Sequence, residues 1–113
     1  MIVQEILTKQ EHLDKAVARL KSSGVELANA ERDYKIELRK QALILRADGM
    51  AVTLIDKVLY GIQSVADNRF KRDVAESVYK ANLEYINTTK LQLRILMEQY
   101  TKEYTSRNVG VGK

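Results

Sequence analysis

The chain contains no proline, and only five of its 113 residues are glycine. Proline and glycine are the residues that most often interrupt helices, so their scarcity lets long stretches stay helical. Two such stretches, residues 1–47 and 63–107, carry helix-forming residues with apolar positions at steps of three and four. The chain is therefore expected to form long helices and little else.

The first stretch predicts one long helix with an apolar seam. Ten positions follow one another from Leu13 at alternating steps of four and three, and seven of them are apolar. Two starting points fit equally: Ile2, or Thr8, which has the capping-box spacing to Glu11. Gly24 either bends the helix or allows a close backbone approach, and because the seam keeps its phase, a continuous helix is favoured. The seam positions are Leu13, Val17, Leu20, Gly24, Leu27, Glu31, Tyr34, Leu38, Gln41 and Leu45.

A turn separates the two long helices. Gly49 is the best candidate for the left-handed residue that ends the first helix. Thr53 and Asp56 have the spacing of a second capping box, which would begin a short apolar helix of about two turns that ends near Gly61. Such a helix is not stable alone and is expected to plug the turn. The second long helix is expected from about residue 62 to about Ser106, followed by a tail over residues 108–113.

These elements predict an all-α fold, namely a long antiparallel helical hairpin with a short linking helix, in one domain over residues 1–107. The apolar positions are too many for one partner helix to cover. In the second long helix one row contains Val74, Val78 and Tyr85, and another contains Tyr79 and Ile86. We therefore expect a homo-oligomer, with a dimer favoured, that forms a helical bundle. A monomer whose N-terminal segment folds back is the competing solution.

The composition argues against most site chemistries. Without cysteine the chain has no disulfide or thiolate metal site. His12 is the single histidine, so the chain cannot supply the paired Glu-x-x-His ligands of a di-iron bundle, and His12 has no identifiable partner serine for a catalytic triad. The sequence also contains no glycine-rich phosphate-binding loop. We expect a non-enzymatic protein without cofactor or metal. No apolar run spans a bilayer and none follows Met1, so a cytoplasmic protein without a membrane partner is expected.

The net charge of +4 is compatible with binding to nucleic acid, which is the alternative hypothesis for the partner. Arg39 and Arg46 lie on one side of the first helix, and Arg69, Lys71 and Arg72 open the second. In an antiparallel hairpin these five residues lie toward the same end, where they could meet phosphate. Interspersed carboxylates dilute their charge, so only low-specificity binding is expected. The full basic row on the first helix is Arg32, Lys35, Arg39 and Arg46.

Four segments carry a resemblance to a known class of proteins. They are Ala30–Lys35, Leu43–Gly49, Val52–Ile55 and Asp73–Ala81. Through them residues 30–95 resemble small helical proteins encoded in the early replication and recombination regions of phages and prophages of Gram-positive bacteria. The resemblance implies a cytoplasmic, non-catalytic protein that works near DNA or a DNA-handling partner. The leading hypothesis is therefore a non-enzymatic interaction or scaffold protein of phage or prophage type.

A second family of small helical hairpins, the ESAT-6-like secreted proteins, does not fit. Its members carry a Trp-x-Gly turn, whereas the turn here reads Asp48-Gly49-Met50. The C-terminal signal of that family is also missing, because Tyr100 is followed four residues later by Tyr104 rather than by an acidic residue.

Overall fold

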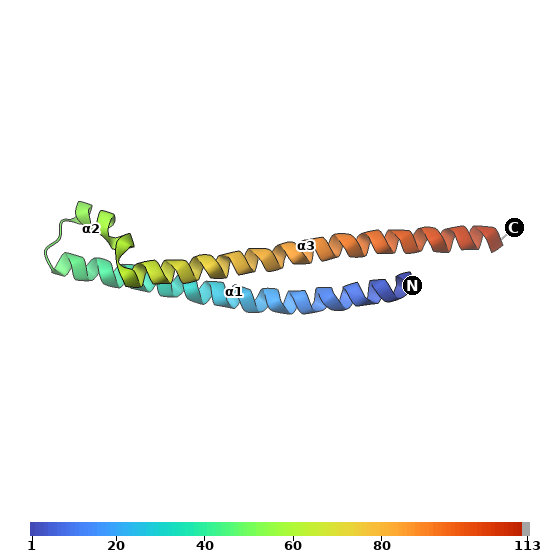
Figure 1. Cartoon of the computed structure of the whole chain (residues 1–113), viewed down its shortest axis with the longest axis horizontal. Coiled ribbons are helices and arrows are strands. Elements are labelled where there is room, and N and C mark those ends of the chain that lie inside the picture. The colour runs from blue at the N-terminus through green and yellow to red at the C-terminus, as the bar shows by residue number, and fades with distance from the viewer. Residues whose placement is uncertain (112–113) are drawn as a thin grey trace. The chain divides into compact units, whose positions relative to one another are not determined.

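The chain folds almost entirely into helix. The computed structural model describes the backbone of residues 1–111 and the side chains of residues 1–107, and that part of the chain contains no strand. Two long helices, α1 and α3, flank a short helix, α2, and one turn of 3-10 helix, η1, which confirms the predicted all-α hairpin with a short linking helix (Figure 1). The bounds are Ile2–Ala47 for α1, Val52–Val58 for α2, Leu59–Gly61 for η1 and Gln63–Val111 for α3.

Helix α1 is continuous, so it begins at Ile2 and Thr8 lies in its interior. It does not break at Gly24, as the phase of the seam predicts. The close approach there is made by a side chain, because a Cβ atom on Gly24 would lie 3.5 Å from Cε2 of Tyr79. Among the described residues, the atoms nearest to that position belong to this ring and not to a neighbouring backbone.

Gly49 ends α1 as predicted. Its φ angle is 89°, in the left-handed region that side chains disfavour. The amide of Gly49 donates to the carbonyl of Arg46 at 3.0 Å, and the amide of Met50 donates to the carbonyl of Leu45 at 3.1 Å. This pair of hydrogen bonds is a Schellman motif, which satisfies two of the carbonyls that a helix end leaves open.

The predicted capping box at Thr53 is wrong. Helix α2 begins at Val52 and its N-cap is Ala51, two residues before the predicted N-cap, and Ala51 makes no side-chain capping hydrogen bond. The carbonyl of Ala51 already accepts from the amides of Leu54 and Ile55 at 2.9 and 3.0 Å. Thr53 is therefore inside the first turn, where its hydroxyl cannot cap. Burial of the apolar residues that follow holds α2 in place instead.

The linking segment plugs the turn as expected. Leu59 of η1 is buried against Tyr34 of α1 and Val65 of α3, the last of which is completely buried. Half-buried apolar residues from α1, and one residue between η1 and α3, pack against this cluster. They are Leu38, Ala42, Leu45 and Ile62.

The chain divides into two compact units, residues 1–21 with 81–113 and residues 22–80. Within each unit, a stretch of α1 lies antiparallel to a stretch of α3 (Figure 1). In α1 one predicted seam row is confirmed, because all of its members are buried or half-buried. The second predicted row is confirmed at Gly24, Leu38 and Leu45, which are half-buried, but not at Val17 and Glu31, which are exposed. Ala16 and Ser23, beside Val17 and Gly24, are 1% and 5% exposed, whereas Val17 is 38% exposed. Small side chains let two helices approach closely, which the hydropathy pattern does not signal. The confirmed row is Leu13, Leu20, Leu27, Tyr34 and Gln41.

Helix α3 carries the two rows that its sequence predicts, and they differ in burial. The row through Tyr79 and Ile86 is buried or half-buried, while the row through Val74 and Val78 is exposed. Helical backbone continues to Val111, into the segment 108–113 that the sequence assigned to a tail. Residues 112 and 113 lie outside the described part of the chain.

Candidate interaction surface

Of the five predicted basic residues, Arg72 lies in the helix seam of the unit formed by residues 22–80. Its guanidinium carbon is 4.6 Å from the ring centroid of Tyr34, which is 6% exposed. Nη2 of Arg72 also pairs with Oδ1 of Asp73 at 2.9 Å, and this hydrogen bond raises the pKa of Arg72 above its ordinary value. Stacked and paired in this way, the guanidinium stabilises the seam and offers little charge to a phosphate.

Arg69 and Lys71 are both exposed on α3 but do not share a side. Residues two positions apart in an α-helix differ in direction by about 200°, so the side chains of Arg69 and Lys71 leave α3 on opposite sides. Arg69 lies over the ring of Tyr60, with 5.9 Å between its guanidinium carbon and the ring centroid. The run of basic residues that opens α3 therefore does not make one cationic surface.

Arg39 and Arg46 belong to a row of exposed residues. The row follows steps of four and three along α1, on the side away from the buried Tyr34, and every member is exposed. It alternates arginine with a large aliphatic residue, and the aliphatic members, Ile36 and Leu43, are 59% and 56% exposed. We call this the outer row of α1. Its members are Arg32, Ile36, Arg39, Leu43 and Arg46.

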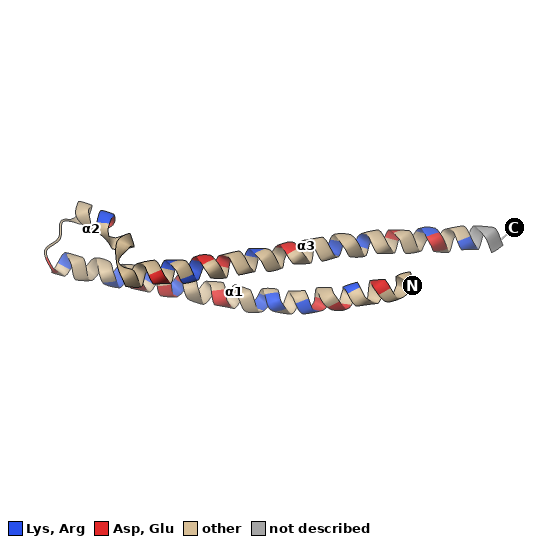
Figure 2. Ribbon diagram, viewed as in Figure 1, with Lys and Arg blue, Asp and Glu red and all other residues tan. Residues whose placement is uncertain are grey.

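The outer row lies in a region of positive charge. Residues 32–46 contain five basic and two acidic residues. One acid, Asp33, pairs with Arg32 at 3.4 Å, and both side chains are more than half exposed, so this contact is weak. Within the described part of the chain, neither Arg39 nor Arg46 makes an ion pair. Figure 2 shows the basic and acidic residues mixed along both long helices.

The second acid in that segment, Glu37, lies in the seam rather than on the outer row, and it is half-buried. Nε2 of Gln41 donates to Oε1 of Glu37 at 2.8 Å. This hydrogen bond, followed by one from Ser64, lowers the pKa of Glu37 below its ordinary value. Glu37 is therefore ionised at neutral pH but does not neutralise the outer arginines.

Helix α3 offers a second open surface, which the sequence predicts. Phe70, Val74 and Val78 follow one another at four-residue steps and are 69%, 46% and 45% exposed. In the sequence, steps of three and four lead on to Tyr85 of the other unit, which is 44% exposed. The guanidinium carbon of Arg19 lies 5.8 Å from the ring centroid of Tyr85. We call the row that begins with Phe70 the open row of α3. It is apolar, whereas the outer row of α1 is both apolar and cationic.

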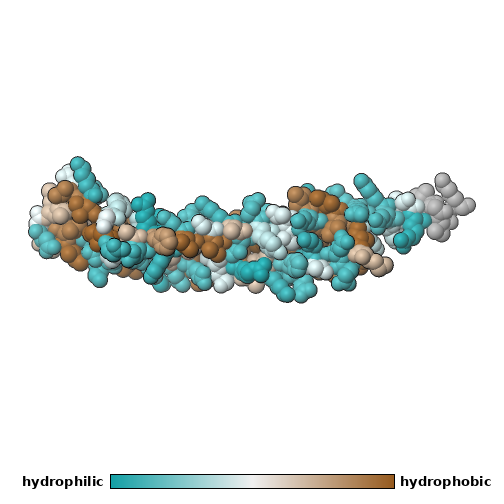
Figure 3. Space-filling view, in the orientation of Figure 1, coloured by the Kyte–Doolittle hydropathy of each residue, from teal (hydrophilic) through white to brown (hydrophobic). Residues whose placement is uncertain are grey.

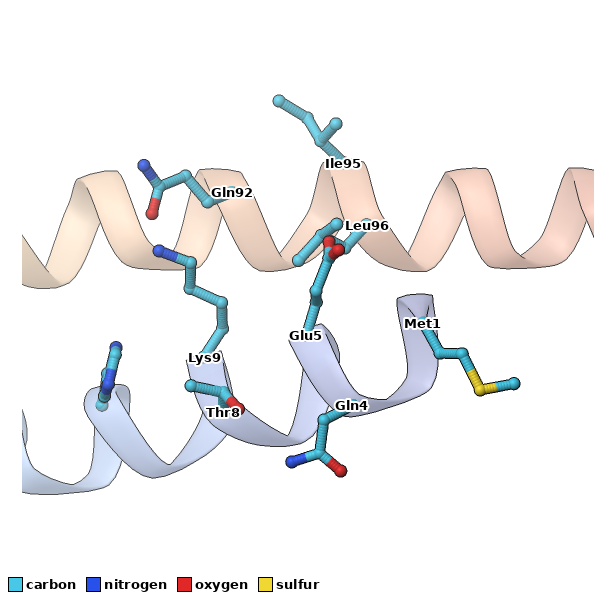
Figure 4. A pocket seen from close by; sticks show the side chains of 9 residues that line it. Met1, Gln4, Glu5, Thr8, Lys9, Gln92, Ile95 and Leu96 are labelled. Carbon is cyan, nitrogen blue, oxygen red and sulfur yellow. The ribbon is translucent and has the colours of Figure 1, made fainter.

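The unit formed by residues 1–21 and 81–113 has a groove of about 550 Å³ between α1 and α3. Glu5 and Lys9 point from α1 toward α3, whereas Ile95 points away from α1 (Figure 4). His12 also lines the groove and is exposed. The groove is open, and most of its polar groups belong to long, flexible side chains. It is an open gap between the two helix stretches of that unit.

No protein-family model, curated protein or solved structure matches this chain. No helix in the described part is long and apolar enough to cross a bilayer. The described residues also hold no group of three or more His, Cys, Asp or Glu side chains that could bind a metal.

The sequence analysis identified the arginines but missed that Ile36 and Leu43 alternate with them in one row. The spacing of these residues could have revealed the row. The arginines repeat every seven residues, the aliphatic residues do the same, and the two sets are offset by three or four positions. A surface with that period is a typical partner for another helix.

Proposed function

We propose that this chain is a non-enzymatic interaction or scaffold protein that works by offering open helix faces to other helices. One observation carries the proposal: among the described residues, 22 large hydrophobic side chains are exposed and only six hydrophobic residues are buried. Figure 3 shows apolar side chains reaching the surface at several places on one face. A monomer seldom leaves so much apolar surface in water, so assembly accounts for it best.

The proposal includes a homo-oligomer, with a dimer favoured, in which the open row of α3 is covered. Val74 and Val78 have the heptad spacing to Ala81 and Tyr85 that a packed helix pair uses. Burial of that row would make α3 the shared helix of a bundle, with α1 on one side and a helix of a partner on another.

Light scattering across about 1–100 µM protein tests this part of the proposal. The chain should have at least twice the monomer mass, and its melting temperature should rise with concentration because unfolding releases subunits. Val74→Glu with Val78→Glu should lower the mass by placing carboxylates in the contact. The matched control is Val25→Glu, since Val25 is 61% exposed on α1 and lies outside that row. A monomer mass at all concentrations would contradict the proposal of a homo-oligomer.

A phage or prophage setting, and work in the cytoplasm near DNA-handling partners, are further parts of the proposal. They rest on the resemblance of residues 30–95 described above. Tagged protein expressed in its native host and cross-linked before lysis should recover proteins of DNA replication or recombination. Recovery of unrelated partners only would contradict this setting without affecting the proposed assembly.

Low-specificity nucleic-acid binding is the second candidate, and the exposure of Arg39 and Arg46 is the observation that favours it. Arg72 is engaged in the seam, so about two or three phosphate contacts remain on α1, with a log–log salt slope near −0.9 for each contact on duplex DNA. Arg39→Ala with Arg46→Ala should then flatten the slope. No binding at about 50 mM salt would reject this candidate.

A further inference from the structure

We infer that the outer row of α1 is a docking site for an acidic amphipathic helix of another protein. The inference rests on the proposed function and names the chemistry of the partner. The docking surface is a single stretch of one helix within the unit formed by residues 22–80. It combines open cationic groups with open aliphatic groups at a spacing that matches a second helix.

The geometry of the row suits a helix. Arg32, Arg39 and Arg46 repeat every seven residues, and Ile36 and Leu43 repeat at the same interval between them. Fifteen residues of α-helix span about 21 Å, or four turns, which is a usual length for a helix contact. A partner helix with apolar residues at steps of three and four would place them beside Ile36 and Leu43, and its flanking positions beside the arginines.

The charge of the row selects an acidic partner. Residues 32–46 have a net charge of +3, and the carboxylate of Glu37 is turned to the seam. Arg39 and Arg46 have no ion pair within the described part of the chain, so their guanidinium groups are open to carboxylates of a partner. Arginine binds a carboxylate through two parallel hydrogen bonds, which adds direction as well as charge.

The two aliphatic residues of the row favour an acidic protein helix over a nucleic acid or an anionic lipid surface. A phosphate backbone offers no apolar group to Ile36 or Leu43, so a duplex would leave both residues in contact with water. A lipid surface needs a broad apolar face that inserts into the bilayer, and here arginine interrupts the aliphatic residues at every turn. A helix with both carboxylates and apolar side chains uses all five members of the row.

A designed peptide pair tests the inference. The probe is a fluorescent 21-residue helix with leucine at two positions and glutamate at the flanking positions of each heptad, and its counterpart carries lysine in place of glutamate. Fluorescence anisotropy at about 50 mM salt should show that the protein binds the glutamate peptide and not the lysine peptide. Arg39→Glu with Arg46→Glu should lower affinity for the first peptide at least about tenfold and create affinity for the second.

Two further variants separate a helix contact from simple charge attraction. Ile36→Ser with Leu43→Ser keeps every charge and should weaken binding of the glutamate peptide about tenfold, because the apolar contacts are lost. Lys90→Glu with Arg94→Glu on α3 changes the net charge as much as the arginine reversal does, and it should leave the peptide affinity within about twofold. Circular dichroism of each variant should show unchanged helix.

The inference is overturned if the glutamate peptide does not bind at about 1 mM, or if the Ile36 and Leu43 changes have no effect. Tighter binding of a 20-base-pair duplex or of vesicles rich in phosphatidylserine, lost in the arginine reversal, would assign the row to those ligands instead. A fall in the mass of the protein alone in the arginine reversal would assign it to contact between copies. In that last outcome the proposed interaction function stands and only this partner is wrong.

Discussion

Two glycines in this chain should respond in opposite ways to the same substitution. Gly24 lies inside α1 with a helical backbone, whereas Gly49 follows α1 with a φ angle of 89°. In the interior of a helix, alanine is more favourable than glycine by about 1 kcal/mol. At a left-handed position an alanine side chain costs about 1–2 kcal/mol. We therefore expect Gly24→Ala to raise the free energy of unfolding and Gly49→Ala to lower it.

The structure sets the magnitude at Gly24. A Cβ atom there would lie 3.5 Å from Cε2 and 3.9 Å from Cδ2 of Tyr79, which is ordinary van der Waals contact. The added methyl needs no shift of the ring and gains a few tenths of a kcal/mol of dispersion. At Gly49 nothing lies within 4 Å of the new atom, so the backbone angle is the only cost. The expected changes are about +1 kcal/mol for Gly24→Ala and about −1 kcal/mol for Gly49→Ala.

Thermal unfolding followed by circular dichroism at 222 nm measures both changes. One kcal/mol should move the melting temperature by about 4 °C in a chain of this size. Protein concentration must be the same in every sample, because self-association itself raises the melting temperature. The two sites share no neighbour, so the double variant should unfold near the temperature of the unmodified chain.

Loss of stability in Gly24→Ala would refute the reasoning at that site. It would mean that the ring of Tyr79 lies closer than 3.5 Å in solution or that α1 is not continuous there. A gain of stability in Gly49→Ala would show that the helix does not end in a left-handed residue.

Four other substitutions test the packing, the seam acid and the capping of the linking helix. Tyr34→Ala removes a buried aromatic side chain and should lower the free energy of unfolding by about 3–5 kcal/mol in urea titration; a loss below about 1 kcal/mol would contradict its place in the core. The hydrogen bond from Gln41 lowers the pKa of Glu37, so this carboxylate stabilises the fold above its unfolded pKa of 4.5, and the benefit is lost as the pH falls through the lower, folded value. Glu37→Gln should accordingly make stability less dependent on pH between about 3 and 5, and an unchanged slope would contradict the shift. Thr53→Ala should change stability by less than about 0.5 kcal/mol and Ala51→Asp should add about 1 kcal/mol, whereas a capping role for Thr53 would reverse this order.

Spacing alone was enough to predict the helices and the strong stop between them. The apolar steps through Leu13, Leu20 and Leu27 fixed one seam row, and Gly49 marked the end of α1. Both signals are local, because they depend on the helical period and on the one residue that adopts positive φ at low cost. Neither needs knowledge of what the helix packs against.

The burial of Ala16 and Ser23 in place of Val17, and the start of α2, depended on tertiary contacts. Ala16 and Ser23 are buried because two helices approach closely there, and small side chains carry too little hydropathy to show it. The capping box at Thr53 had the right spacing, but α2 is held by the burial of Ile55 and Leu59 and starts where that burial places it. Capping preference is worth about 1 kcal/mol, which packing overrides.

Proximity in the sequence was misleading for the basic residues. Arg69, Lys71 and Arg72 read as one cluster, yet an α-helix turns about 100° at each residue. One of them therefore points into the seam, and the other two leave α3 on opposite sides. On α1 the same rotation has the reverse effect, because Arg39 and Arg46 are seven residues apart and share a side. Functional rows on long helices are found by period and not by adjacency.

The cluster of Tyr34, Leu59 and Val65 beside the turn has a consequence for how the chain folds. Tyr34 and Val65 are 31 residues apart, whereas Arg19 and Tyr85 are 66 residues apart. Closing the longer loop first would cost about 0.6 kcal/mol more entropy, and it would not form the core cluster of Tyr34, Leu59 and Val65. Once the turn cluster has formed, each further contact between the two helices closes a loop of only a few residues. Pairing of the helices should therefore proceed stepwise from the turn toward the chain ends. Val65→Ala should then slow folding, while Ile86→Ala should mainly speed unfolding.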